Sequence, residues 1–455
     1  MEPSGHHYVA IFGGSVAGSE AAFQLAERGI RVVVFDQNTL PYGKIEDGLP
    51  LWHVKLRDKE EQNIDEKLSH PNIRFVPDIR LGRDIEFNDV VRNWGFSAVI
   101  IAVGAWKDRP LPVEGIDAYV GKGLIYQNPL IYWFNHKHEP DYSGPEIEID
   151  DNALIIGGGL ASLDVVKVVM IETVQKALQQ KGINEDIFTL ARSIKKVLEK
   201  HNLTISDLGL NGCTLFYRRR GKDMPLTSRP KETPDQIVKI ESISQKVIDN
   251  SREKYLFHFE ECYAPIDKIV QDGKLKGLIF QKTEVVNGNL RVVEGETKKA
   301  EGSVVISSIG SIPEKIPGIP SEKEIFKITN PVSCRIEGYD NVFAIGNAVT
   351  GRGNIKESLH HGRETTLKIM DQYLDMQETD FHNYLRNTED RIALQATSIA
   401  EQISQKSIIN DEAIRSILAK TRKFQDKVGF NGSYLDWIDR KKPVRLEKFI
   451  SSNNV

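Results

Sequence analysis

The chain has 455 residues, of which 27% are charged and 40% hydrophobic, and its net charge is −4. This length suggests two or three domains, and the balance is that of a soluble globular protein without a global basic field for nucleic acid. No apolar run is long enough for a membrane span, no signal-peptide pattern precedes the first strand, and the three cysteines form no Cys-x-x-Cys pair. We therefore expect a cytoplasmic protein without a dithiol redox pair, an iron–sulfur cluster or a metal site of its own.

Near the N-terminus, a buried strand, a glycine turn and a helix are predicted in succession. The apolar run 8–12 shows no polar alternation, and Gly13 and Gly18 follow it ahead of a stretch of helix formers. A second apolar run, 31–35, ends in Asp36, at the distance beyond the turn that a dinucleotide fold needs. The turn would place backbone N–H groups against a pyrophosphate, and the Asp36 carboxylate would bind both ribose hydroxyls of an adenosine.

The middle position of this glycine triplet is Ser15. A glycine there lets the backbone approach the phosphates closely. We interpret Ser15 as a tolerated small residue whose hydroxyl donates to a phosphate oxygen. An ordinary strand–turn–helix without a ligand is the alternative, and a second copy of the motif further along the chain disfavours it.

Beyond Asp36, the chain is predicted to complete a first sheet and then leave it. Residues 37–50 form an irregular loop with Pro and Gly punctuation, a natural place for cofactor contacts. The apolar run 98–105, which contains Gly104, is predicted to be a strand that passes beneath the cofactor. The Pro-rich stretch 109–112 is then the first crossing of a linker.

Residues 152–167 repeat the layout of strand, glycine turn and helix. Three successive glycines begin at Gly157, and Ser162 occupies the third small position of the motif. A Ser or Ala at that position widens the spacing between helix and strand, a change typical of sites for NADP rather than FAD. The second unit is therefore predicted to bind NADP.

A predicted strand at 213–217 is followed by the basic cluster 218–222. In a dinucleotide fold an acid at this strand end binds the ribose of NAD. Arg219 and Arg220 instead suit a dianionic 2′-phosphate through bidentate hydrogen bonds. Arginine-rich turns are usually solvated surface, but the position at a strand end favours the phosphate.

The residues after this cluster are predicted to complete the second domain. Residues 255–310 contain several β-rich runs with no chemistry of their own, and 287–289 carries a hairpin signal. The Pro-rich stretch 312–320 marks the return linker.

The chain then re-enters the first domain at 341–347. Glycines in 351–358, followed by a helix, suggest a helix N-terminus aimed at an electron-rich ring carbonyl. A polar helical segment begins at about residue 379, and 436–443 is predicted to be a docking surface on the first domain or a dimer contact.

The sequence resembles the adrenodoxin-reductase-like branch of ferredoxin–NADP reductases, which is related to the small subunit of glutamate synthase. The resemblance covers most of the chain and rests on the order and spacing of the two glycine turns and of 41–43, 102–105, 163–165, 219–221, 353–355 and 437–446. It implies an α/β fold with two Rossmann-like dinucleotide-binding domains. An NADP-binding domain, 111–325, is inserted into a discontinuous FAD-binding domain made of 1–110 and 326–455, the latter ending in a helical segment.

The resemblance also implies the contacts of two cofactors, FAD and NADP(H). Together with the local pattern, it places FAD at Gly13, Ser15, Ala17, Gly18, Asp36, Lys44, Leu81, Gly104, Gly346, Asn347, Gly353, Asn354 and Ile355. It places NADP(H) at Gly157, Gly158, Gly159, Leu160, Arg219 and Arg220. Lys44 and Asn347 depart from the family, which usually has an apolar residue and a Trp there, so the surroundings of the flavin ring are expected to differ.

Three further residues are catalytic candidates through the resemblance: His53, Asp164 and Glu232. His53 and Asp164 match positions that the family uses near the flavin, and an imidazole–carboxylate pair tunes protonation during electron transfer. The alternatives are a packing histidine and an acid favoured by a helix start. Glu232 matches a family carboxylate, but a shorter local loop leaves its register open.

The activity implied is that of an FAD-dependent NADPH oxidoreductase of the ferredoxin–NADP reductase type. Electrons would pass from NADPH through FAD to a ferredoxin-type iron–sulfur protein, or in the reverse direction. The alternatives are an electron-input subunit of a larger enzyme, a reductase of quinones or other small acceptors, and a non-catalytic nucleotide-binding regulator. The first alternative usually carries cluster cysteines, which this chain lacks. A homodimer is compatible with the sequence, and nucleic acid is not an expected partner.

Overall fold

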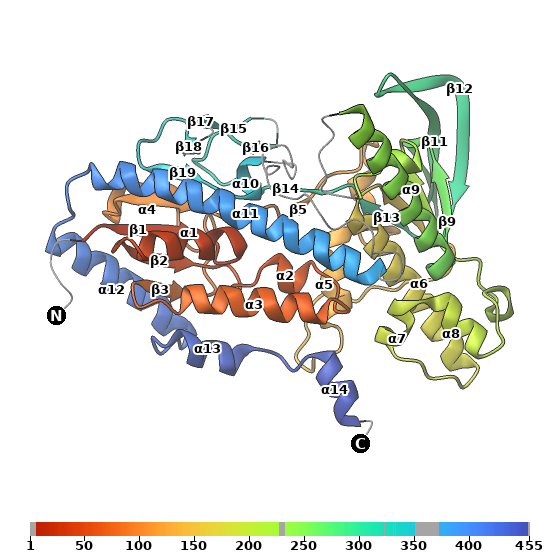
Figure 1. The fold of residues 1–455 in the computed structure, drawn as a ribbon, viewed down its shortest axis with the longest axis horizontal. Helices are drawn as coiled ribbons and strands as arrows, with labels where there is room; N and C mark the ends of the chain where they lie inside the picture. Colours follow the sequence, from red (N-terminus) through yellow and green to blue (C-terminus); the bar gives the residue numbers. More distant parts are fainter. Residues whose placement is uncertain are drawn as a thin grey trace.

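The structure is a computed structural model that describes residues 6–226, 233–322, 324–330, 332, 334–350 and 373–453. Its described strands form a seven-stranded sheet, a five-stranded sheet, a three-stranded sheet and two two-stranded ribbons. Figure 1 shows the seven-stranded sheet and its helices in one half of the molecule and the five-stranded and three-stranded sheets in the other.

The seven-stranded sheet combines both ends of the chain. Its spatial order is β17 (Ile328–Asn330), β18 (Arg335–Ile336), β19 (Val342–Ala344), β4 (Ala98–Ile101), β1 (Tyr8–Phe12), β2 (Arg31–Phe35) and β3 (Ile73–Val76). The five strands from β19 to β3 are parallel, and β18 and β17 are antiparallel additions at one edge. All five residues of β1 are buried, which explains its unbroken apolar run.

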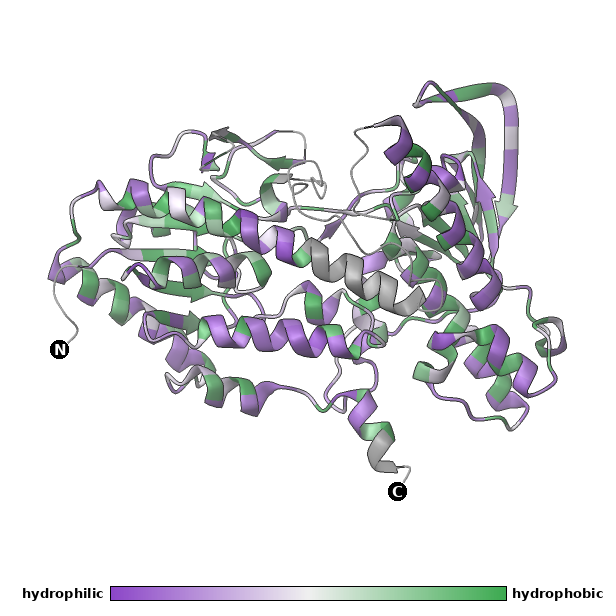
Figure 2. Cartoon of the chain, in the orientation of Figure 1, coloured by the Kyte–Doolittle hydropathy of each residue, from purple (hydrophilic) through white to green (hydrophobic). Residues whose placement is uncertain are grey.

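Helices cover both faces of this sheet. One face packs against α1 (Val16–Ala26), α3 (Val54–Leu68), α11 (Tyr373–Ser404) and α13 (Tyr434–Lys441), and the other against α4 (Phe87–Asn93) and α12 (Asp411–Val428). The strands are hydrophobic in Figure 2, whereas α3 is mostly hydrophilic along its exposed side. The C-terminal helices are therefore part of this domain's core, and the buried Trp437 donates from its indole nitrogen to the Thr39 carbonyl at 2.8 Å.

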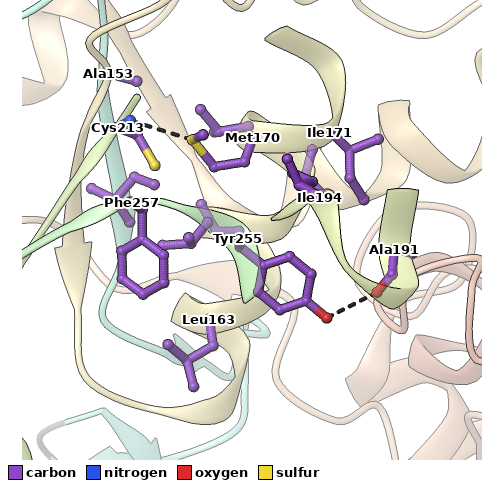
Figure 3. Packing of buried hydrophobic residues seen from close by; sticks show 14 of the residues in the cluster. Ala153, Leu163, Met170, Ile171, Ala191, Ile194, Cys213, Tyr255 and Phe257 are labelled. Carbon is purple, nitrogen blue, oxygen red and sulfur yellow. Dashed lines mark hydrogen bonds between the residues drawn. The ribbon is translucent and has the colours of Figure 1, made fainter. Parts of the chain in front are cut away.

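The five-stranded sheet is parallel throughout. Its order is β6 (Leu124–Tyr126), β13 (Val305–Ser308), β7 (Leu154–Gly157), β8 (Thr214–Tyr217) and β9 (His258–Glu261). One face packs against the helices α5 (Gln127–His136), α6 (Leu160–Gln180), α7 (Ile187–Arg192), α8 (Ile194–Lys200) and α9 (Pro234–Tyr255). Figure 3 shows this core, where the Tyr255 hydroxyl donates to the Ala191 carbonyl at 2.8 Å and the Cys213 amide faces the Met170 sulfur.

The other face of the five-stranded sheet packs on a long antiparallel meander. It consists of β10 (Tyr263–Gln271), β11 (Lys274–Val286) and β12 (Asn289–Glu301), and Phe216 stacks on Phe280 with ring centroids 4.1 Å apart. The predicted hairpin is confirmed, because Asn287 and Gly288 have φ values of 50° and 77°, as its two-residue turn requires.

Two crossings join the halves of the molecule. The outgoing strand β5 (Lys107–Asp108) pairs antiparallel with the returning strand β14 (Ser311–Ile312). The predicted fold class is confirmed, since a parallel α/β unit is inserted between the strands of another. The limits proposed for the domains stay predictions. No helix in the described part of the chain is long and apolar enough to cross a membrane.

The short elements complete the connections. They are α2 (Lys44–Asp47), α10 (Asn347–Thr350), α14 (Leu446–Asn453), the ribbon of β15 (Ser321–Glu322) and β16 (Ile325–Phe326), and the 3-10 turns η1 (Ile116–Tyr119), η2 (Ser206–Leu208) and η3 (Gly221–Asp223). Strand β4 ends at Ile101, so the predicted strand 98–105 is too long, and Gly104 lies beyond it in a left-handed conformation with φ 69°.

Candidate active site

A cavity of about 340 Å³ opens where the parallel strands of the seven-stranded sheet end. Ligands of open α/β sheets bind at this edge, outside the carboxyl ends of the strands. The predicted residues that line the cavity are Gly13, Ser15, Ala17, Asp36, Lys44, Leu81, Gly104, Gly346 and Asn347. Gly18 lies behind the wall, and Gly353, Asn354 and Ile355 fall outside the described residues.

The first turn needs its two flanking glycines for different reasons. Gly13 has φ 104°, and a Cβ there would lie 2.4 Å from the Ala102 carbonyl oxygen. A Cβ on Gly18 would lie 1.7 Å from the Gly13 carbonyl oxygen. Gly18 therefore lets α1 approach the end of β1, and Gly13 keeps the turn in contact with the strand end beside it.

Ser15 lines the cavity and links two segments of its wall. Its hydroxyl donates to the Tyr42 carbonyl at 2.9 Å and so fastens the loop before α2 to the start of α1. The predicted donation from this hydroxyl to a phosphate stays a prediction, and it would replace the hydrogen bond to the Tyr42 carbonyl. No side chain caps α1, so the N–H groups of its first turn keep their capacity for an anion in the cavity.

Asp36 is buried at the wall of the cavity. Its Oδ2 accepts from the Gly14 amide at 2.6 Å, and its Oδ1 accepts from the Asn38 amide at 2.8 Å. Burial raises the pKa of Asp36 to about 7, and the two backbone hydrogen bonds oppose this rise. Each oxygen retains a further lone pair for a ribose hydroxyl, so an uncapped helix start and this carboxylate together fit the adenosine and pyrophosphate of a dinucleotide.

Lys44 lines the same cavity, but its ammonium is held by residues of the other half of the chain. Its Nζ donates to Asn128 Oδ1 at 3.2 Å and to Ser311 Oγ at 3.0 Å. Burial lowers the pKa of Lys44 to about 8, against the attraction of Asp108. Nothing in the local sequence around Asn128 or Ser311 could have predicted these contacts.

The second glycine turn follows β7 and begins α6. A Cβ on Gly157 would lie 2.5 Å from the Ser308 carbonyl oxygen, and a Cβ on Gly158 would lie 2.1 Å from the Tyr217 ring. Gly159 is the N-cap of the 21-residue helix α6, which starts at Leu160 without a side-chain cap. This turn therefore offers a second open helix N-terminus, and the Tyr217 ring packs directly on it.

The two arginines stand directly beyond β8, as the sequence suggested, but both are already engaged. Arg220 donates from Nε and Nη2 to the two oxygens of Asp223, each at 2.8 Å, and Arg219 donates to the Gly288 carbonyl at 2.9 Å. A phosphate bound by Arg220 would compete with Asp223. The sequence analysis missed Asp223, although its spacing of three residues from Arg220 permits the pair.

His53 and Asp164 are brought together from the two halves of the molecule. The distance from His53 Nε2 to Asp164 Oδ1 is 3.9 Å, and His53 is buried. Beside this pair, the ammonium of Lys167 lies 4.0 Å from the centroid of the Trp52 ring, a contact that the sequence did not reveal. Glu232 lies outside the described residues.

Comparisons with known proteins agree with this architecture. The family described as pyridine nucleotide-disulphide oxidoreductase matches residues 7–204. NADPH-ferredoxin reductase FprA of Mycobacterium leprae is 23% identical over 420 residues, covering 84% of this chain and 87% of the relative. The probable NADPH:adrenodoxin oxidoreductase of Schizosaccharomyces pombe is 22% identical, covering 72% and 74%.

A second kind of relative is the glutamate synthase [NADPH] small chain of Bacillus subtilis, 26% identical over 80% of this chain and 67% of the relative. Among solved structures, Mycobacterium tuberculosis FprA in complex with NADPH aligns with a TM-score of 0.65 and 16% identity, over 93% of this chain and 91% of that one. The resemblance predicted from the sequence is confirmed, and the fold is that of FprA.

Proposed function

We propose that this chain, a relative of NADPH–ferredoxin and NADPH–adrenodoxin reductases, is an FAD-containing oxidoreductase that takes electrons from NADPH and passes them to a ferredoxin-type iron–sulfur protein. The observation that carries the proposal is the pairing, in one chain, of the Asp36 cavity with a second uncapped helix start at Gly159. Each can hold one dinucleotide through backbone N–H groups.

When bound, FAD would supply the redox chemistry, because a flavin can take up hydride from NADPH and give up electrons one at a time. The residues of the chain would bind the two dinucleotides and orient them toward each other. In this proposal, Asp36 holds a ribose, the first turn of α1 holds the FAD pyrophosphate, and the start of α6 holds that of NADPH. The three cysteines all lie within the described residues and form no disulfide there, so no cysteine pair is assigned to the reaction.

His53 and Asp164 are proposed to hold a proton between the two nucleotide sites. The imidazole comes from the residue before α3, and the carboxylate comes from the fifth residue of α6. Asp164 Oδ1 is buried without a hydrogen-bond partner among the described residues. A buried carboxylate oxygen facing a histidine favours the protonated imidazole when charge develops nearby. Glu232 keeps its predicted catalytic role as an untested proposal.

The absorbance spectrum of the purified protein and stopped-flow bleaching of its flavin by NADPH test this function. We expect flavin absorbance and rapid bleaching by NADPH. Bleaching by NADH is expected to be slower, because NADH lacks the 2′-phosphate that Arg219 and Arg220, which follow β8, are proposed to bind. A colourless protein that gains no flavin on reconstitution would contradict the proposal and favour a nucleotide-binding regulator. Reduction of quinones but not of ferredoxins would favour a small acceptor.

A second candidate is the electron-input subunit of a larger enzyme, which the similarity to a glutamate synthase small chain favours. Co-purification with a large partner would support this candidate. Reduction of ferredoxin by the purified chain without any partner protein would oppose it. A homodimer remains a proposal that the measured mass in solution would test. A cytoplasmic location is likewise a proposal, and a reducing compartment suits three cysteines that form no disulfide.

A further inference from the structure

A cluster of polar side chains joins the cofactor cavity to the crossings between the two halves of the molecule. Its members, here called the Lys44 cluster, are Lys44, Asp108, Asn128 and Ser311. Lys44 is the first residue of α2, Asp108 and Ser311 belong to the paired crossings β5 and β14, and Asn128 lies in the first turn of α5. One ammonium thus meets groups that lie 84 and 267 residues away in sequence.

The cluster closes on itself through Asn128. Its backbone amide donates to Asp108 Oδ1 at 3.2 Å, and its side-chain amide donates to the Trp106 carbonyl at 2.8 Å and to Ser311 Oγ at 3.1 Å. Asp108 and Ser311 are themselves partners in the β5–β14 ribbon. Lys44 therefore contacts the returning crossing at Ser311 and the start of α5 at Asn128, and Asn128 connects this point to the outgoing crossing at Asp108.

The backbone of Lys44 is fixed on its own side as well. Gly43, which precedes it, has φ 55°, and a Cβ on Gly43 would lie 2.9 Å from Ser15 Cβ. The Ser15 hydroxyl also holds the Tyr42 carbonyl at 2.9 Å. Lys44 thus stands at a defined place relative to the start of α1, where the first dinucleotide is proposed to bind.

We propose that Lys44 is a positioning residue that fixes the orientation of the five-stranded-sheet domain relative to the cofactor cavity. The effect that we infer for electron transfer rests on the proposed function. Hydride transfer requires the nicotinamide ring and the flavin ring to meet at contact distance. In the proposed function, these rings are held by different domains that two short crossings join. The hydrogen bonds of Lys44 at the crossings would set the fraction of time in which the two domains are aligned for hydride transfer.

The electrostatics of the cluster agree with this assignment. Burial lowers the pKa of Lys44 to about 8 and raises that of Asp108 to about 6, so both charges are held away from water. A buried charge is costly unless partners hold it in place, and a methionine of similar length would avoid that cost. In Lys44→Met, the buried Asp108 carboxylate would lose the attraction of the Lys44 ammonium and keep its hydrogen bond from the Asn128 amide. We therefore expect the crossings to weaken rather than the fold of either domain.

The test combines hydrogen exchange with flavin reduction in the full chain. In Lys44→Met, the amides of Asn128 and of the β5–β14 ribbon are expected to exchange about tenfold faster, measured by mass spectrometry on the protein without added nucleotide. Flavin reduction at saturating NADPH is expected to slow about tenfold, while the half-saturating NADPH concentration stays unchanged because the Gly157–Gly159 turn is untouched. Ser311→Ala probes the same contact from the other side and should shift both rates in the same direction.

Lys55→Met is the matched control, because Lys55 is an exposed lysine at the start of α3 outside the cluster. It should leave exchange and reduction at wild-type values. Unchanged exchange at the crossings in both Lys44→Met and Ser311→Ala would overturn the inference even if flavin reduction were slower. Faster exchange in a protein that never reduces flavin would support the domain contact and overturn the proposed function.

Discussion

Replacing His136 with glutamine tests an ion cluster that joins α5 to α2. His136 Nε2 lies 3.2 Å from Asp47 Oδ1, and Nδ1 lies 2.8 Å from Glu139 Oε1. Both ring nitrogens face carboxylates, so the doubly protonated imidazolium is favoured and the pKa of His136 rises from 6.5 to about 9, although burial opposes the rise.

The size of the effect follows from this pKa. At 1.36 kcal/mol for each pKa unit, the difference between 6.5 and about 9 corresponds to about 3 kcal/mol of stability. Burial raises the pKa of Asp47, so its ionised carboxylate is destabilised in the folded state, and about 3 kcal/mol is the upper end of the expected effect of the pair. The pKa of His136 is higher in the folded state than in the unfolded state. The stabilisation from His136 is therefore fully present below pH 6.5 and is lost as the pH rises through 9.

Urea unfolding of wild type and His136→Gln, followed by circular dichroism across pH 6 to 10, measures this directly. The difference in free energy of unfolding between the two proteins should be about 3 kcal/mol at pH 6 and should fall toward zero above pH 9. His258→Gln, at an exposed histidine of β9, is the control and should change the free energy of unfolding only slightly. A constant difference for His136→Gln would refute the reasoning.

Three further predictions concern the nucleotide sites. Asp36→Ala should weaken FAD binding to the apoprotein about 10- to 100-fold in a fluorescence titration, since two charge-assisted hydrogen bonds are lost; unchanged affinity would exclude Asp36 as the ribose ligand. Gly158→Ala should cost about 1–3 kcal/mol in urea unfolding because its Cβ would meet the Tyr217 ring, whereas Gly159→Ala, with no atom within 4 Å of its Cβ, should cost under about 0.5 kcal/mol. Asp223→Asn should raise the preference for NADPH over NADH about tenfold in kcat/KM by removing a competing carboxylate from Arg220, and an unchanged preference would show that Arg220 does not bind the 2′-phosphate.

Local chemistry made the two nucleotide units predictable. The strand before Gly13, the helix after it and the acid at the end of β2 are all set by period and turn geometry within about 30 residues. The same reasoning placed Arg219 beyond β8 and the hairpin at Asn287. These features depend on residues that are neighbours in sequence, so a single amino-acid sequence is enough to predict them.

The partners of the polar groups depended on the tertiary structure. Lys44 meets Ser311 only because the returning crossing β14 pairs with the outgoing crossing β5 beside α2. The pairing of His53 with Asp164 needs both domains in place. The polar appearance of the C-terminal segment also concealed the buried face that carries Trp437. A sequence fixes which groups can donate, accept or carry charge, but which of them meet across hundreds of residues is decided by packing, where a buried polar group must find a partner.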